Sequence, residues 1–485
     1  MKTWIRKHRI EHPVRFTLKS LLLFALLYLI VGATAPFFSY PEVTESTVSD
    51  FDLSEFRHGT PGCDRVGIIE TNEGAWEERM RLLSRAEERI VLATFDMRPG
   101  ESTKDILAVL LNRADAGVQV KILVDGLSGL LRMEGKEMFY ALSSHPNVEI
   151  RLYNKPNLLT PWKLQGRMHD KYVIVDEEAY LLGGRNTFDY FIGTYTDKNV
   201  SLDREVLVYN TQPGNLSSSL YELEAYFKGV WNQKECRPFH EDERLAETEK
   251  VREQRAMLEE RFRSLLGSHP HLFDESWDYG AHTYETGAVR LLSNPTAIYS
   301  KEPVLFYQMT RLMEEARERV VIQSPYVVCN DYMYGRLREL KEKVPDTRLI
   351  LNAVENGDNF VASSDYLRHK EEIWDTGITL YEYDGGISNH GKSILIDDDL
   401  SLIGSYNLDL RSSYLDTELM LVIESKELNR ELEGYMKAME ADSRKVLDGK
   451  NYEIPSHLTP AKAPLWKRAA WKIFGFVIQP FRGLI

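Results

Sequence analysis

Two histidine–lysine pairs recur in matched surroundings along this 485-residue sequence. The stretch HDKYVIVD begins at His169 and HGKSILID begins at His390, and the lysine, Lys171 or Lys392, comes two positions later. A G-[G/S]-x-N sequence follows each copy at the same distance. One such pattern would be weak evidence for a functional site, whereas two copies at matched spacing are strong evidence.

The alternation of both copies predicts a strand, on which side chains two positions apart share one face. Each imidazole should therefore project beside its ammonium. The asparagine of the return strand, Asn186 or Asn407, should lie on that face too. So should Gly184 or Ser405, small residues that let a ligand approach closely.

Such a surface suits displacement at a phosphodiester, which needs a nucleophile, an acid for the leaving alkoxide and donors for the non-bridging oxygens. One histidine would attack phosphorus to give a phosphohistidine while the other protonates the departing alcohol. A single histidine or lysine more often has a structural or solvated role, but the duplication favours a shared anion site. Because an ammonium beside each imidazole repels divalent cations, we expect no metal and no cofactor.

Carboxylates downstream of each motif are candidates to orient the histidines and favour their charged form. SLDREVLVYN supplies Asp203 and Glu205, and YLDTELMLVIE supplies Asp416 and Glu418. We predict that Glu205 and Glu418 orient the histidines. The two aspartates are equally well explained as caps at a strand entry.

The repeat extends beyond the motifs and predicts the fold class. AEERIVLATF is echoed by ARERVVIQSP, and NVEIRLYN is echoed by GITLYEY. Each half reads as helix, strand, helix, strand and motif hairpin, which is an α/β unit. We place the two duplicated α/β domains at residues 66–235 and 287–440, joined by a charge-rich helical linker at 236–286.

The N-terminus predicts a membrane anchor. Residues 21–38 are uncharged and apolar over close to the ~20 residues that span a bilayer core. A basic segment at 1–20 precedes them and an acidic linker at 39–65 follows, so the positive-inside rule predicts an extracytoplasmic catalytic part. A cleaved signal peptide is the alternative, since residues 33–35 have the small-x-small form, but Pro36 is a poor cleavage context.

The C-terminal segment, residues 441–485, contains PLWKRAAWKIFGFV, which predicts an amphipathic helix lying in a membrane interface. The residues on its predicted apolar face are Trp466, Ala470, Ile473, Phe474 and Val477. A terminal helix that docks on the domain core is the alternative. KPNLLTPWKLQGR, before the first motif, is either a lipid-headgroup contact or a simple loop.

Three cysteines, Cys63, Cys236 and Cys329, show no metal-ligand spacing. A Cys63–Cys236 disulfide would tie together the two ends of the first domain, and three buried free thiols are the alternative. The net charge of −14 argues against nucleic acid as a partner, because nucleic-acid-binding domains are usually basic.

HDKYVIVD and HGKSILID, each with its G-[G/S]-x-N, resemble the paired HKD motifs of the phospholipase D superfamily, and the surrounding sequence is similar to bacterial cardiolipin synthases. The likeness covers most of residues 66–425. It implies two phospholipase D-like α/β sandwich domains that share one active site, no metal, and a phosphatidyl-histidine intermediate. By motif position, the implied catalytic residues are His169, Lys171, Asp176, His390, Lys392 and Asp397, with Asn186, Asn407, Ser405 and Gly184 on the phosphate. Side-chain parity, in contrast, favours a structural role for the two motif aspartates.

The resemblance also implies an activity: a phosphatidyltransferase in a bacterial cell membrane, with His169 as nucleophile and His390 as acid. Its first-choice reaction is two phosphatidylglycerols giving cardiolipin and glycerol, and phosphatidylethanolamine with phosphatidylglycerol is the second. A phospholipid-hydrolysing phosphodiesterase, or a nuclease, is the alternative within the superfamily. A non-enzymatic membrane scaffold is disfavoured because neither motif is degenerate. The chain departs from many family members in having one N-terminal hydrophobic segment rather than two.

Overall fold

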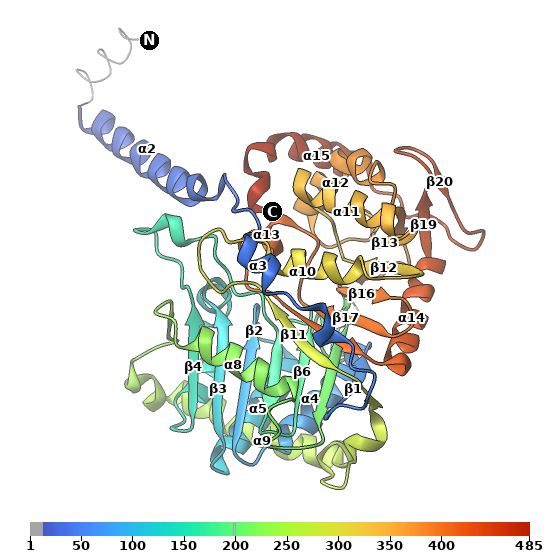
Figure 1. The fold of residues 1–485 in the computed structure, drawn as a ribbon. Helices are drawn as coiled ribbons and strands as arrows, with labels where there is room; N and C mark the ends of the chain where they lie inside the picture. The colour runs from blue at the N-terminus through green and yellow to red at the C-terminus, as the bar shows by residue number, and fades with distance from the viewer. Residues whose placement is uncertain (1–12, 197, 199) are drawn as a thin grey trace.

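Two nine-stranded mixed sheets, one from each half of the chain, form the frame of the protein (Figure 1). The computed structural model describes residues 13–196, 198 and 200–485. The strand order is β10-β1-β8-β6-β5-β2-β3-β4-β9 in the first sheet and β11-β18-β17-β16-β12-β13-β14-β19-β20 in the second. The two orders correspond nearly strand for strand, which confirms the predicted duplicated α/β fold.

The first half supplies the first sheet and its helices. Its strands are β1 (Asp64–Ile69), β2 (Arg89–Thr94), β3 (Gln119–Asp125), β4 (Val148–Tyr153), β5 (Tyr172–Val175), β6 (Ala179–Gly183), β8 (Glu205–Asn210), β9 (Cys236–Pro238) and, from the start of the next segment, β10 (Tyr284–Glu285). Its helices are α4 (Asn72–Ser84), α5 (Glu101–Asp115), α6 (Gly126–Ser128), α7 (Glu137–Ser143), α8 (Ser219–Trp231) and α9 (Glu249–Ser268).

The second half repeats this arrangement. Its strands are β11 (Val289–Ser293), β12 (Arg319–Gln323), β13 (Asp346–Asn352), β14 (Thr379–Tyr383), β16 (Ser393–Ile396), β17 (Leu400–Gly404), β18 (Leu419–Glu424), β19 (Ser443–Val446) and β20 (Tyr452–Glu453). Its helices are α10 (Val304–Met313), α11 (Asp331–Lys343), α12 (Phe360–Trp374), α13 (Leu410–Tyr414), α14 (Lys426–Ala441) and α15 (Leu465–Val477).

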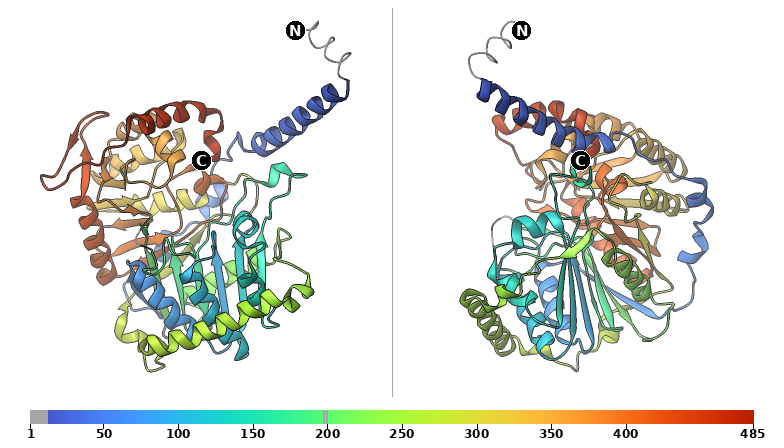
Figure 2. Two further views of the ribbon diagram at one scale, coloured as in Figure 1. Left: turned by 180° about the vertical axis from the view of Figure 1, so that it is seen from behind. Right: turned by 90° about the vertical axis from the view of Figure 1, so that its left-hand side faces the viewer.

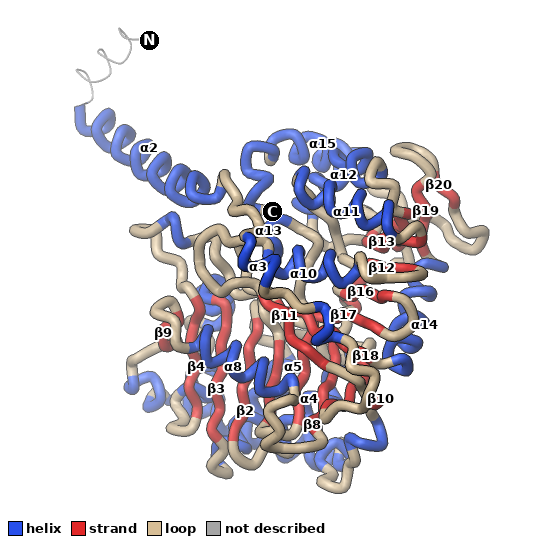
Figure 3. The backbone as a smooth tube through the Cα atoms, viewed as in Figure 1, coloured by secondary structure: helices blue, strands red, loops and turns tan. Residues whose placement is uncertain are grey.

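Parallel strands β2-β3-β4 and β12-β13-β14 are flanked on both sides by antiparallel strands, and runs such as RIVLAT are buried on both faces. Helices α4, α5, α7 and α9 cover the outer face of the first sheet, and α10, α11 and α12 cover that of the second (Figure 3). A third core lies between the sheets, with α8 and α14, and contains Val91, Ile174, Val321 and Leu395. This shared apolar layer fixes the two motif hairpins relative to each other.

Strands at the sheet edges come from outside the predicted domain ranges. The linker range 236–286 contains β9, which pairs with β4, and β10, which pairs with β1. The range ending at 440 omits β19 and β20. Between β9 and β10, α9 packs against α5 and α7 through buried Val251, Leu258 and Leu265, so the charged linker helix is a covering helix of the first domain.

Helix α2 (Pro13–Thr34) projects away from both domains (Figures 1 and 2). Thr17–Phe37 is, within the described residues, the one helical stretch long and apolar enough to cross a membrane. The basic residues Lys2, Arg6, Lys7 and Arg9 of the predicted cytoplasmic segment lie outside the described residues.

The cysteines are all buried and unpaired, so the disulfide that the sequence suggested between Cys63 and Cys236 is not formed. The thiol of Cys236 donates instead to the carbonyl of Val230 at 3.1 Å.

Candidate active site

The two histidines meet at the junction of the halves, where short segments cross from one half to the other. Strand β7 (Ser201–Leu202) pairs with β15 (Ser388–Asn389) in parallel. The backbone N–H of His390 donates to the carbonyl of Leu202 at 2.7 Å, and that of His169 donates to Thr417 at 3.3 Å. The main chain of each histidine is therefore held by the opposite half.

Each histidine side chain also pairs with a carboxylate from the opposite half. Nδ1 of His169 lies 2.8 Å from Oε1 of Glu418, and Nδ1 of His390 lies 2.7 Å from Oδ2 of Asp203. Both carboxylates are fully buried. A carboxylate on Nδ1 fixes the ring and its tautomer, so Nε2 is the nitrogen left for chemistry.

Glu418 lies where the sequence placed it, but the prediction that Glu205 orients a histidine is wrong. Glu205 forms a buried ion pair with Arg79 at 2.5 Å and lies 3.5 Å from Arg185. Asp203 takes the place beside His390. Asp416, the repeat equivalent of Asp203, pairs with Arg411 at 2.8 Å and orients no histidine.

A shift of two residues between the halves explains this difference. Each histidine N–H binds the residue just before its carboxylate, which is Leu202 before Asp203 but Thr417 before Glu418. In the repeat alignment Leu202 corresponds to Leu415 rather than to Thr417. The two crossing segments are therefore displaced in register.

Gly184 and Ser405 match the two different carboxylates. A Cβ at Gly184 would lie 2.4 Å from Oδ1 of Asp203, so a side chain there would collide with this carboxylate. In the second half, the hydroxyl of Ser405 donates to Oε2 of Glu418 at 2.5 Å. Both residues thus shape the surroundings of a carboxylate. Their contact with the substrate phosphate stays a prediction.

The motif lysines and asparagines line the same junction and are buried. Lys171 and Lys392 each donate to the backbone carbonyl of their own motif histidine, and Lys392 lies 3.8 Å from Oδ2 of Asp203. The carboxamide oxygens of Asn186 and Asn407 have no hydrogen-bond partner in the described part of the chain. Buried polar atoms without partners are rare, and here they leave two hydrogen-bond acceptors free for a ligand.

The motif aspartates Asp176 and Asp397 lie seven residues, or roughly 23 Å of extended chain, beyond each histidine. Both have positive φ, 49° and 51°, at the hairpin turn. The carboxylate of Asp176 accepts backbone N–H groups of residues 87–89, and that of Asp397 accepts those of residues 317–319. These contacts give them the structural role that parity predicted and contradict their inclusion among the catalytic residues.

Electrostatics make the two halves unequal. Burial raises the pKa of Glu418 to about 8. Burial opposes ionisation of Asp203 as well, but the charges of Lys392 and His390 outweigh it and lower the pKa of Asp203 to about 2. A permanent carboxylate therefore lies beside His390, whereas the carboxyl beside His169 titrates near neutral pH.

The basic groups are shifted downward. Burial, with Lys171, lowers the pKa of His169 well below its ordinary value, and burial, with Lys392, lowers that of His390. Burial also lowers the pKa of Lys171 to about 7. His169 is therefore neutral at physiological pH, which is the form in which an imidazole can attack phosphorus.

The internal sequence repeat did not reveal three further residues at this junction. Rings of Phe95 and Phe191 lie 4.9 Å and 5.3 Å from the His169 and His390 rings. Arg204 crosses to the second half, where Nη1 donates to Gln323 and to Ser393 at 2.7 Å and 2.8 Å. Phe95 and Arg204 have no counterparts in the second half, where Pro325 and Thr417 stand, so the repeat could not reveal them.

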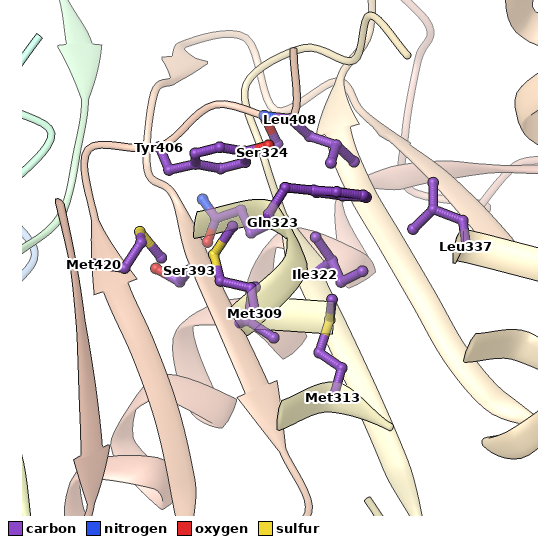
Figure 4. Close-up of a pocket in the computed structure, with 12 residues that line it drawn as sticks. Met309, Met313, Ile322, Gln323, Ser324, Leu337, Ser393, Tyr406, Leu408 and Met420 are labelled. Carbon is purple, nitrogen blue, oxygen red and sulfur yellow. The ribbon is translucent and has the colours of Figure 1, made fainter. Parts of the chain in front are cut away.

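Gln323 and Ser393 also line a cavity behind β12, together with Met309, Met313 and Met420 (Figure 4). Its volume of about 20 Å³ gives room for roughly one water molecule. It is a packing void of the second domain rather than a phospholipid site.

Comparison with known proteins identifies the class. The family model "Cardiolipin synthase, PLD-like domain" matches residues 80–231 and 309–440, one segment in each half. The chain therefore belongs to this family, and it is a phospholipid phosphatidyltransferase of the phospholipase D superfamily.

Similar proteins span most of the chain. Cardiolipin synthase C of Escherichia coli K12 is 27% identical over 411 residues, covering 76% of this chain and 83% of that protein. Cardiolipin synthase A of Klebsiella pneumoniae is 22% identical over 437 residues, covering 88% and 78%. The crystal structure of phosphatidylserine synthase from Haemophilus influenzae aligns with a TM-score of 0.61 at 14% identity, covering 87% and 95%, which shows a shared fold.

The contrasting environments of Asp203 and Glu205 predict that substitutions at the two residues cause different defects. Asp203→Asn should fold but lose at least ~100-fold in kcat, because His390 loses the carboxylate that stabilises its charged form. Glu205→Gln should mainly lower the free energy of unfolding, by about 3 kcal/mol, because Arg79 and Arg185 keep buried charges without a carboxylate. Kinetics and denaturant unfolding of both variants check this. Equal catalytic loss in the two would contradict the assignment.

Proposed function

We propose that the protein joins two phosphatidylglycerol molecules into cardiolipin through a phosphohistidine on His169. The observation that carries this proposal is the pair of buried histidines, each oriented by a carboxylate of the opposite half and flanked by lysine and asparagine donors. Displacement at phosphorus needs this set of groups. The cardiolipin synthase names of the relatives above support the choice of lipid.

In the first step, Nε2 of His169 attacks the phosphorus of one phosphatidylglycerol and forms an N–P bond. The P–O bond to the headgroup glycerol breaks, and the imidazolium of His390 gives its proton to the leaving alkoxide. Lys171, Lys392 and the two asparagine amides bind the non-bridging oxygens.

In the second step, His390, now neutral, takes the proton of the glycerol hydroxyl of a second phosphatidylglycerol. That oxygen attacks phosphorus, the N–P bond breaks, and cardiolipin leaves with both histidines restored. Water in place of the second lipid would give phosphatidic acid, which is the phosphodiesterase alternative. Phosphatidylethanolamine as one of the two lipids is the second substrate choice.

The assignment of roles to the two histidines rests on their partners. Asp203 is ionised at every physiological pH and stabilises a proton on His390, the general acid. Glu418 has a raised pKa and stabilises a charge on His169 less well, which favours the neutral nucleophile.

The location of the reaction follows from α2, which we propose spans a bacterial cell membrane once. The basic residues before it and the acidic residues after it favour an extracytoplasmic position for both catalytic domains. The substrate would then be taken from the outer leaflet of that membrane.

The product assay tests the proposed reaction directly. Full-length protein in detergent, given labelled phosphatidylglycerol, should form cardiolipin and free glycerol with or without chelator. His169→Ala and His390→Ala should each lose at least ~100-fold, because nucleophile and acid act in one step. Asp176→Asn, which alters a turn contact, is the matched control. Phosphatidic acid as the sole product would replace the transferase with a phospholipase.

Activity should also depend on pH in one direction. The ammonium of Lys171, whose pKa is about 7, and the proton of His390 are both lost as pH rises, whereas His169 stays neutral down to acid pH. The value of kcat/KM, which reports the free enzyme, should therefore fall as pH increases through about 7. A profile of initial rates, with circular dichroism to verify folding at each pH, measures this. A rise in kcat/KM over the same range would contradict it.

A further inference from the structure

The loop after β4 exposes large apolar side chains shortly before the first motif histidine in the chain. Leu159 is 78% exposed, Leu158 is 64% exposed and Trp162 is 37% exposed. The loop leaves the carboxyl end of β4, and the chain then runs to His169. The loop therefore lies at the same end of the strands as the motif histidines. Apolar groups of this size normally lie exposed together only where a partner covers them.

Helix α15 exposes a second apolar surface. One face docks on α12, where Trp471 is buried and Gly475 packs against the backbone of Ser364. The opposite side leaves these residues exposed: Leu465, Trp466, Ile473, Phe476 and Val477. Docking on the domain therefore accounts for one face of α15, and the opposite, exposed face is the one that the interfacial interpretation concerns.

Basic side chains flank that apolar surface. Arg468 and Lys472 are exposed, and neither forms an ion pair within the described residues. An apolar helix face bordered by unpaired cations is typical of segments that lie in the interface of an anionic membrane.

Helix α2 contacts the loop after β4. The hydroxyl of Tyr28 donates to the carbonyl of Leu159 at 2.8 Å, and the α2 backbone at Gly32 packs directly on Pro161. In Figure 1 the loop after β4 lies below α2, and α15 lies to the right of the C-terminal end of α2. The candidate membrane span therefore leaves the protein beside this loop.

The C-terminal tail completes the connection to α15. Past α15, the carbonyl of Gly483 accepts a hydrogen bond from Tyr40, which follows α2. The guanidinium of Arg411, on α13 beside the second motif, donates to the carbonyls of both Gln165 and Leu484. Loop, anchor and terminal helix are thus tied together around the active-site junction.

We propose that the loop 157–162 and the exposed face of α15 form one membrane-contacting rim, which rests in the interface of the bilayer that α2 crosses. Trp162 and Trp466 would lie at the headgroup level that tryptophan prefers. The active site then opens at the depth of the phospholipid phosphates. The choice of phosphatidylglycerol as substrate rests on the proposed function, but the rim itself does not.

This position explains how a buried site acts on an insoluble substrate. A phospholipid reacts at its headgroup phosphate, and its acyl chains stay in the bilayer when the mouth of the site lies against the membrane.

Site-specific fluorescence tests the rim, and the chain offers a matched control. Leu216 is 79% exposed, almost the same as Leu159, but it follows the far end of β8, whose near end meets the histidines. The three native cysteines are buried, so Leu159→Cys, Trp466→Cys and Leu216→Cys can each carry one environment-sensitive dye. Full-length protein is reconstituted into phosphatidylcholine–phosphatidylglycerol vesicles with brominated acyl chains.

Dyes at 159 and 466 should shift to the blue and be quenched by the bromines, and the dye at 216 should show neither effect. Equal quenching at 159 and 216, or none at 159 and 466, would overturn the rim. Quenching at 159 and 466 in a protein that turns over no phospholipid would support the rim and count against the proposed function.

A charged substitution gives a second measurement. Leu159→Asp should lower kcat/KM on bilayer substrate about tenfold more than on a monomeric short-chain phosphatidylglycerol, because only the bilayer reaction needs rim contact. Leu216→Asp should change neither value. An equal loss on both substrates in Leu159→Asp would show a general defect and overturn the proposal.

Discussion

The exchange of carboxylates between the two halves is the constraint on which the rest of the structure depends. Asp203 reaches His390 and Glu418 reaches His169, each across the junction at 2.7–2.8 Å. A fully buried carboxylate without a cationic or hydrogen-bonding partner costs several kcal/mol, so neither half is electrostatically complete alone. The apolar layer between the sheets and the crossing of Arg204 serve to hold these pairs in register.

Burial makes the protonation of the two histidines and of the two lysines sensitive to nearby charges. Both histidines and both lysines are almost free of solvent, so small differences in charge decide which group holds a proton. Because the charges of Lys392 and His390 act on Asp203, this carboxylate stays ionised, whereas Glu418, beside Lys171 and two serine hydroxyls, keeps a raised pKa and titrates near neutral pH. In the proposed reaction, the different roles of the two histidines thus follow from the surroundings of the carboxylates.

Much of the fold and the motif residues was predictable, because a duplication displays the same apolar alternation and polar spacing twice. Which carboxylate pairs with which histidine across the junction was not predictable. Sequence alignment equates Glu205 with Glu418, but the crossing segments are shifted by two residues, and register in such short segments depends on tertiary packing. The available signal was that Gly184 stands where the second half has Ser405. The missing side chain leaves room for the carboxylate of Asp203 to approach the backbone at Gly184. Phe95 and Arg204 have no counterparts in the second half, so symmetry concealed them.

The mismatch between Gly184 with Asp203 and Ser405 with Glu418 has a consequence for the assembly of the two halves. A homodimer of first halves would place an aspartate beside both histidines, and a homodimer of second halves would place a glutamate beside both. Either assembly would be symmetric, with no difference in proton affinity between its two imidazoles. Because the copies differ at these positions, only the pairing of a first half with a second half gives two unequal histidines, and a single chain that carries both halves ensures this pairing.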